Sequence, residues 1–283
     1  MGKNLKSSLA GQWYCDDVEE LSEELSDYIS NVDQKQLDNV MAILLPHAGY
    51  SYSGQVAAYG INQIAGRKYK RVIILGPTHQ VHMIDAVSIP DCDYIETPFG
   101  RQALDVEFIK KLRKYPEVQS IEQVHQHEHS VQIELPMLQY VLDDFKLVPI
   151  VVGRLDEDLI RKLAKILLEN IDDETLVVVS SDFTHYGKAF GYLPFSNDIE
   201  NNLKALDMGA FRYIENGDFT GFLEYIDTTG ATICGRYPIA ILLAMLPENT
   251  SVELLNYQTS GHITGDWSHC VSYLSAAVTG KWG

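Results

Sequence analysis

Histidines follow the ends of three apolar runs in this sequence, and this repetition is its main chemical signal. His47 follows AILLP, His79 follows RVIILGPT, and the stretch LVVVSSDFTHYG carries Asp182 and His185. Imidazole is the side chain most used to hold a transition metal, and it also transfers protons near neutral pH. We therefore expect a metal site or an acid/base site where these runs end.

Taken alone, each of these histidines is most simply explained as a hydrogen-bonded structural residue. Their repetition favours a functional site, because a site built from several loops needs ligands from distant points in the chain. Pro46 stops the first run directly before His47, which places that histidine just past the end of a strand. In an open α/β sheet, loops leaving the carboxyl ends of the strands converge on one crevice.

Strands and helices are expected to alternate along most of the chain. Buried strands are indicated at 43–45, 71–75, 85–90, 146–153, 176–181, 252–258 and 270–279, and helices at 15–32, 54–65, 105–115, 156–170, 198–214, 219–226 and after Gly235. This alternation predicts an α/β fold with a parallel-rich mixed sheet flanked by helices on both faces. We expect a single domain that spans residues 1–283.

Three further histidines alternate in the stretch VHQHEHSVQIELPML, which begins at residue 124. Alternate residues of an extended segment share a face, so His125, His127 and His129 could form a metal patch. A solvated loop is the simpler explanation for His125 and His127. His129 directly precedes Ser130 and a stretch with helical spacing, and it is expected where a helix begins at the rim of the sheet.

Cys234 is one of four cysteines that lie far apart and show no CxxC spacing. This distribution argues against a zinc ribbon or a disulfide scaffold and favours reduced thiols in a cytoplasmic protein. Cys234 and Gly235 precede a strongly apolar helix, and the positive end of a helix dipole favours a thiolate. A buried small apolar residue is the simpler explanation of a lone cysteine.

Composition excludes several classes of partner. The chain has 22 basic and 39 acidic residues, a net charge of −17, which repels nucleic acid and anionic membranes. No apolar run approaches the roughly 18 residues that a membrane span needs. The first residues contain no apolar signal-peptide core, so we expect no secretion and a cytoplasmic location.

Five motifs, in this order and at this spacing, resemble the Memo family, including its bacterial members named as the B component of the AmmeMemoRadiSam system. They read PHAGYSYSG, LGPTH, EHSVQIELP, SSDFTHYG and TICGRYPI, and they cover most of the chain from about residue 47. Memo proteins in turn resemble the class III extradiol dioxygenases in fold. The resemblance implies a single α/β domain whose crevice holds a metal between two histidines and a third ligand.

Carried over position by position, the resemblance assigns roles to five residues. His47 and His79 match the histidine pair of the family, Cys234 matches its third site residue, and Asp182 and His185 match two further pocket residues. We therefore expect metal ligands at His47, His79 and Cys234. His185 is expected to act as a general acid or base, with Asp182 orienting it or joining the metal shell.

A cysteine in the third ligand position changes the expected chemistry. Two imidazoles and a carboxylate form the facial triad with which Fe(II) binds oxygen and substrate together. The thiolate of Cys234 is softer and shifts preference toward copper, zinc or a thiolate-bound iron, and it can itself be oxidised. This departure argues against catechol ring cleavage. The expected cofactor is a transition metal, with iron or copper ahead of zinc.

Three functions remain open at this point. The first is a metal-dependent oxidoreductase that uses iron or copper to act on a small substrate. The second is a non-enzymatic protein that binds a peptide or small ligand in the same crevice. The third and weakest is a metal-assisted hydrolase that uses a metal-bound water. The family name also raises the expectation of a radical-SAM partner protein.

Overall fold

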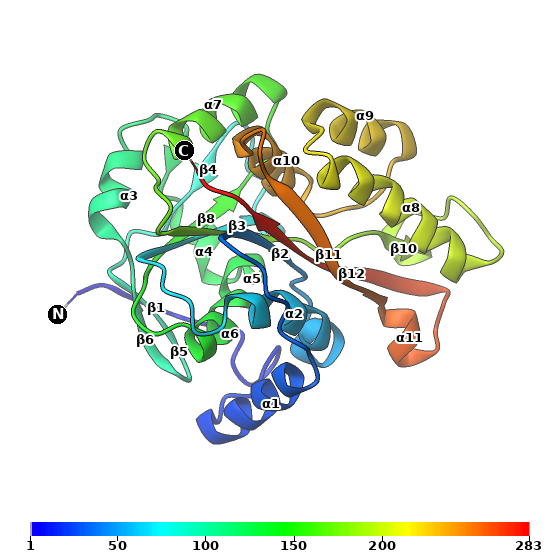
Figure 1. Ribbon diagram of the computed structural model, residues 1–283, viewed down its shortest axis with the longest axis horizontal. Coiled ribbons are helices and arrows are strands. Elements are labelled where there is room, and N and C mark those ends of the chain that lie inside the picture. Colours follow the sequence, from blue (N-terminus) through cyan, green and yellow to red (C-terminus); the bar gives the residue numbers. More distant parts are fainter. Residues whose placement is uncertain (1, 283) are drawn as a thin grey trace.

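The computed structural model describes residues 2–282 and is built on a nine-stranded mixed sheet (Figure 1). Its strands are β2 (Val40–Leu45), β3 (Arg71–Pro77), β4 (Val87–Ser88), β7 (Val118–Gln119), β8 (Lys146–Val152), β9 (Thr175–Ser180), β10 (His185–Gly187), β11 (Ser251–Thr259) and β12 (His269–Thr279). The strand order is β10-β12-β2-β9-β3-β8-β4-β7, and β11 pairs with β12. The predicted α/β fold with a parallel-rich mixed sheet is confirmed.

The four central strands of the sheet are parallel, and the strand next to them on each side is antiparallel to them. Strands β2, β9, β3 and β8 pair in parallel, whereas β12 runs antiparallel to β2 and β4 runs antiparallel to β8. Every residue of β2 and β9 is buried, which explains why these strands are continuous apolar runs. Because β2, β3 and β9 are parallel, the loops at their carboxyl ends all leave at the same edge of the sheet.

Helices cover both faces of the sheet, as predicted. They are α1 (Val18–Ser30), α2 (Tyr50–Ile64), α3 (Val106–Leu112), α4 (Glu122–Gln126), α5 (His129–Gln132), α6 (Glu134–Val141), α7 (Glu157–Leu168), α8 (Ile199–Glu215), α9 (Phe219–Thr229), α10 (Arg236–Met245) and α11 (Ser260–Thr264), with a 3-10 turn η1 (Lys188–Phe190). In Figure 1, α2, α5 and α6 lie on one side of the sheet and α7 and α10 lie on the other. Helix α1 packs outside α2, and α8 packs against α9 and β11.

Helix α2 begins earlier than its spacing predicted. It begins at Tyr50, not at residue 54, so the loop that carries His47 is short. Tyr50 is buried, its N–H donates to the carbonyl of Trp13, and its own carbonyl accepts from the Tyr28 hydroxyl. These contacts come from outside the helix, so local spacing does not reveal them. They hold the His47 loop against the sheet edge.

A small second sheet, of β1 (Asn4–Lys6), β5 (Tyr94–Thr97) and β6 (Gly100–Ala103), lies beside the large one. The sequence at 91–100 is rich in turn residues, and we did not expect strands there. Strands β5 and β6 form a hairpin whose second strand begins at Gly100, where a φ of 102° favours glycine. The residues of β6 are mostly polar, so no apolar pattern in the sequence indicates this strand.

One break in a helix bears on the site. Helices α5 and α6 are consecutive and are separated only at Ile133. Pro136 explains the break, because it has no N–H to donate to the carbonyl of Gln132, four residues earlier. The break leaves α5 as a short helix whose first residue, His129, lies near the carboxyl end of β3.

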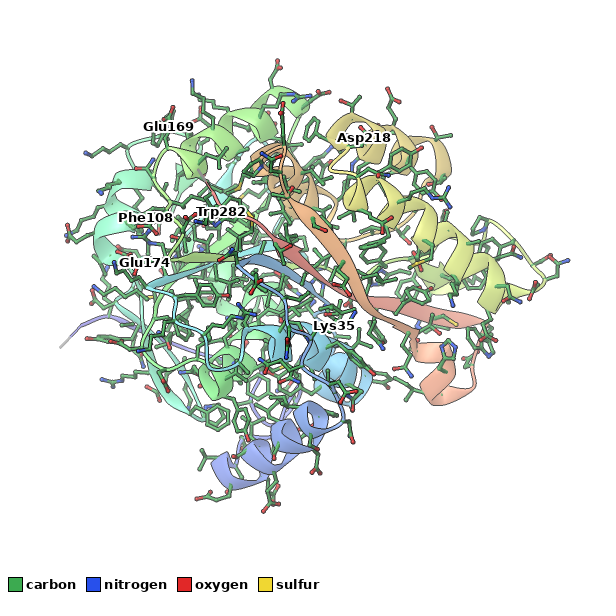
Figure 2. The ribbon with its side chains drawn as sticks, in the orientation of Figure 1. Lys35, Phe108, Glu169, Glu174, Asp218 and Trp282 are labelled. Carbon is green, nitrogen blue, oxygen red and sulfur yellow. The ribbon has the colours of Figure 1, made fainter. Side chains whose placement is uncertain are left out.

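Buried aromatic side chains from two peripheral segments pack against the core. Figure 2 labels two of them, Phe108 on α3 and Trp282 near the C-terminus. The Arg71 guanidinium lies 3.9 Å from the centre of the Phe108 ring, and Trp282 Nε1 donates to the carbonyl of Thr175 at 2.9 Å. Among residues 2–282, no helix is both long enough and apolar enough to cross a membrane.

Candidate metal centre

His47 is held in one tautomer by buried partners. It lies just after β2, is 1% exposed, and donates its backbone N–H to Asp182 Oδ1 at 2.8 Å. Its Nδ1 lies 2.8 Å from Ser180 Oγ, and that hydroxyl also donates to the carbonyl of Ser130. A hydroxyl has one hydrogen, so Ser180 accepts from Nδ1–H of His47. His47 Nε2 therefore presents a lone pair that can bind a metal, on the side of Cys234 Sγ.

His79 is held in the same tautomer by a carboxylate. It lies just after β3, its backbone N–H donates to Glu128 Oε2 at 2.6 Å, and its Nδ1 lies 2.8 Å from Glu128 Oε1. Burial acts to raise the pKa of Glu128, but the hydrogen bonds that it accepts from His79 outweigh burial, and the pKa is lowered. The ionised carboxylate only accepts, so Nδ1 carries the proton and Nε2 is free. A carboxylate behind an imidazole is the usual support of a metal-binding histidine.

Cys234 completes the group from the loop before α10. Its Sγ lies 3.1 Å from His47 Nε2 and accepts the backbone N–H of Asp182 at 3.2 Å. The next residue must be glycine, because a Cβ on Gly235 would lie 2.2 Å from the Ser181 Cβ. Single donor atoms of His47, His79 and Cys234 all lie within 4.8 Å of one another. The structure thus brings together the three residues that the sequence indicated as metal ligands.

The electrostatics of Cys234 and His47 are those of neutral donors. Burial, and then the charge of Asp182, raises the pKa of the Cys234 thiol well above its ordinary value. Burial, and then the nearby histidines, lowers the pKa of His47 well below its ordinary value. The helix N-terminus therefore does not by itself produce the thiolate that the sequence suggested. A bound cation would supply the missing positive charge, and two imidazoles with a sulfur suit a transition metal.

Asp182 supports the His47 loop. Its Oδ1 accepts the backbone N–H of His47, and burial raises its pKa to about 7. Its own backbone N–H and carbonyl both contact Cys234 Sγ, at 3.2 and 3.3 Å. Asp182 therefore ties two of the three candidate ligands together.

His185 begins β10 and is oriented by Thr232. Its backbone N–H donates to Thr232 Oγ1 at 2.9 Å, and its Nδ1 lies 3.1 Å from the Thr232 carbonyl. A carbonyl only accepts, so Nδ1 carries the proton and Nε2 is free. Burial lowers the pKa of His185, which keeps the ring neutral at pH 7. The Phe190 ring meets it edge-on at 5.0 Å and stacks on His269 at 4.5 Å.

Two aromatic rings extend the site beyond the predicted residues. His129 begins α5, as expected, and its ring stacks on His79 at 4.3 Å between centroids and meets His47 edge-on at 5.2 Å. Trp13 stacks on His129 at 4.5 Å. No pattern in the sequence identified Trp13, because it lies in an irregular N-terminal segment whose position depends on the backbone bond from Tyr50 to Trp13.

The other two histidines of the alternating stretch differ in burial. His125 is 5% exposed within α4, and its Nε2 lies 2.8 Å from Ser88 Oγ. The expectation that it lies in a solvated loop was wrong, because β4 passes beside it and supplies the serine. His127 is exposed, as expected.

Glu128 takes part in a second group of close donors. Donor atoms of His79, Glu128 and His129 also lie within 4.8 Å of one another. Glu128 already accepts both His79 bonds and the Ser130 backbone N–H at 3.1 Å. These bonds explain its ionised state without a second cation. We regard this group as support for the first.

Comparisons with known proteins agree on one family. The family model described as "Memo: Memo-like protein" matches residues 6–277. Protein MEMO1 of Homo sapiens is 31% identical over 289 residues, covering 97% of each chain. A MEMO1 family protein of Schizosaccharomyces pombe is 32% identical over 303 residues, covering 95% of this chain and 97% of its own. One of Pyrococcus abyssi is 31% identical, covering 96% and 98%.

A solved structure was also matched. It is the crystal structure of an uncharacterized protein from Escherichia coli K12, at 13% identity and a TM-score of 0.48. The match covers 85% of this chain and all of the other.

Proposed function

The chain belongs to the Memo family, and from this premise we propose that it is a metal-dependent oxidoreductase acting on a small substrate. His47, His79 and Cys234 would hold iron or copper. The observation that carries the proposal is the prepared state of these donors: both imidazoles have Nδ1 engaged, and single donor atoms of the three residues lie within 4.8 Å. Such supported histidines are characteristic of metal sites.

The choice of metal rests on the donor set. Two imidazoles and a thiolate leave coordination positions open, and the soft sulfur favours copper or a thiolate-bound iron over harder ions. Zinc would also bind these donors, but it has no redox chemistry. When bound, iron or copper would supply electron transfer and an open position for a small molecule.

Side chains of the protein would transfer protons during the reaction. His185 is proposed to accept a proton at Nε2, because its Nδ1–H is engaged by the Thr232 carbonyl and its lowered pKa keeps the ring neutral. Asp182 is proposed to position His47 and Cys234. The proton-transfer role of His185 predicts that His185→Ala lowers turnover while the protein keeps its metal. An unchanged rate in every reaction that the metal-loaded protein performs would remove this role.

A second function is favoured by the aromatic residues beside the site. Trp13 stacks on His129, and Phe190 is 37% exposed next to His185. These rings suit binding of a peptide or small ligand without turnover. The two functions differ in one measurable respect, which is whether ligand affinity survives removal of the metal. A radical-SAM partner protein and a cytoplasmic location stay predictions.

The first experiment is metal content per chain. The protein is purified without oxygen and reconstituted with Fe(II) or Cu(I), as wild type, His47→Ala and Cys234→Ser. The matched controls are His127→Ala, an exposed histidine, and Cys92→Ser, a cysteine outside the site.

We expect close to one metal ion per chain in the wild type and in both controls, and loss in the two site variants. Absence of metal above background in the wild type would end the oxidoreductase proposal and leave the ligand-binding function.

A further inference from the structure

We propose that His129 contacts the small molecule that occupies the open position of the metal centre, and that it does so by a hydrogen bond from its ring edge. The proposed ligand class is a small oxygen or nitrogen donor, such as a hydroxyl, an enolate or an anion. This inference rests on the proposed metal site. It assigns His129 a role distinct from that of the three metal ligands.

The first observation is how the His129 ring is held. Its two faces are covered, one by Trp13 at 4.5 Å with 24° between the ring planes, the other by His79 at 4.3 Å with 27°. The side chain is 13% exposed. With both faces covered, only the ring edge, which carries the two nitrogens, is available to a ligand.

The second observation is that these nitrogens have no hydrogen-bond partner within residues 2–282. Glu128 Oε1 lies 3.5 Å from His129 Nδ1, which is beyond a good hydrogen bond. In contrast, His47, His79 and His185 each have Nδ1 fixed by an oxygen at 2.8 to 3.1 Å. Neither nitrogen of His129 is fully enclosed, so the ring edge is open to water and can be reached by a ligand.

The third observation separates His129 from the metal ligands. The group of donors within 4.8 Å of one another contains His47, His79 and Cys234 but not His129. Yet its ring is in contact with His79 and lies 5.2 Å from that of His47. His129 is thus next to two ligands without belonging to the set, which is where a molecule bound to the metal would meet it.

The test uses cobalt and azide as probes. Wild type, His129→Ala and His129→Gln are loaded with Co(II), and Co(II) content is measured before azide is titrated and followed by visible absorption. His127→Ala is the matched control, because it removes an exposed histidine two residues away. We expect all four proteins to hold equal Co(II). We expect azide affinity to fall about tenfold in His129→Ala, the size of one hydrogen bond to an anion, and to stay unchanged in His127→Ala.

Each alternative result overturns a definite claim. Equal azide affinity in His129→Ala and wild type would refute the contact. Loss of Co(II) from both His129 variants, as expected for His47→Ala, would make His129 a metal ligand and also refute it. Absence of Co(II) from the wild type would refute the metal site and this inference together. His129→Gln keeps the test valid if the alanine variant does not fold.

Discussion

The two ends of the candidate site are built differently. At one end, His47 is 1% exposed and both of its side-chain supports, Ser180 and Asp182, are themselves buried. At the other end, His185 is half-buried, is oriented by one threonine, and packs on the exposed Phe190. A metal-binding group must be fixed before its ion arrives, whereas a residue that exchanges protons needs access to solvent.

The difference has an energetic basis. A buried hydrogen bond is costly to leave unmade, so a network of buried partners has one arrangement. A half-exposed group can replace a lost partner with water at little cost. Changes at the His47 end should therefore alter metal affinity strongly, and changes at the His185 end should hardly alter it.

The largest expected effect is loss of the metal itself. Metal that binds only the folded chain at a free concentration 100 times its Kd stabilises it by about 2.7 kcal/mol. We expect a chelator to lower the Tm of the reconstituted wild type and to leave that of His47→Ala unchanged. Differential scanning calorimetry with and without chelator measures both. An equal chelator effect on the two proteins would place the metal elsewhere.

The second effect tests the deepest support. Ser180→Ala removes the acceptor of His47 Nδ1–H, and loss of such a support typically weakens metal affinity by about 10- to 100-fold. Ser88→Ala is the control, because Ser88 is equally buried and supports His125, which is outside the site. Competition titration with a chromophoric chelator gives both affinities. An equal loss of metal affinity in the two variants would mean that the effect comes from removing a buried serine and not from the bond between Ser180 and His47.

The third effect is expected to be smaller. Glu128→Gln replaces the charged partner of His79, and we expect metal affinity to fall by about tenfold or less. The loss is limited because the His79 side chain is 26% exposed, so water can replace part of the lost interaction. Glu122→Gln, an exposed change nearby, serves as the control. A loss greater than that of Ser180→Ala would reverse the order of the two supports.

The smallest effect on metal affinity belongs to the His185 end. Thr232→Val removes the hydroxyl that accepts from the His185 N–H and donates to its carbonyl. We expect a fall in unfolding free energy of about 1 to 2 kcal/mol, from two hydrogen bonds, and unchanged metal affinity. Urea unfolding and the same competition titration check the two parts. Weakened metal binding would show that the two ends are coupled.

Most of the sheet could be predicted from the sequence, and so could the positions of His47, His79 and His185, because they depend on local pattern. Continuous apolar runs mark β2, β3 and β9, and parallel pairing then brings the loops at their carboxyl ends to one edge of the sheet. Cys234 needed the family resemblance, because its distance to His47 depends on how α10 packs. The hairpin of β5 and β6 has no apolar signal and was missed.

The residues that were missed or misjudged depend on contacts from elsewhere in the chain. Trp13 reaches the site because its carbonyl accepts the Tyr50 N–H, a bond that no local pattern encodes. His125 is buried because Ser88 lies beside it. The sequence indicates no role for Glu128, because this residue stands among the histidines of the alternating stretch. In the structure its carboxylate fixes the orientation of His79.

The wide separation of the site residues along the chain has a consequence for biosynthesis. His47 and Cys234, whose donor atoms lie 3.1 Å apart, are separated by 187 residues. Chains emerge from the ribosome N-terminus first, so His47 is made long before its partner, and β2 must wait for both β9 and β12 to pair. A nascent chain that ends before Cys234 holds only two of the three proposed ligands. The complete set of donors therefore exists only after the chain beyond Cys234 has been made and has packed against β2.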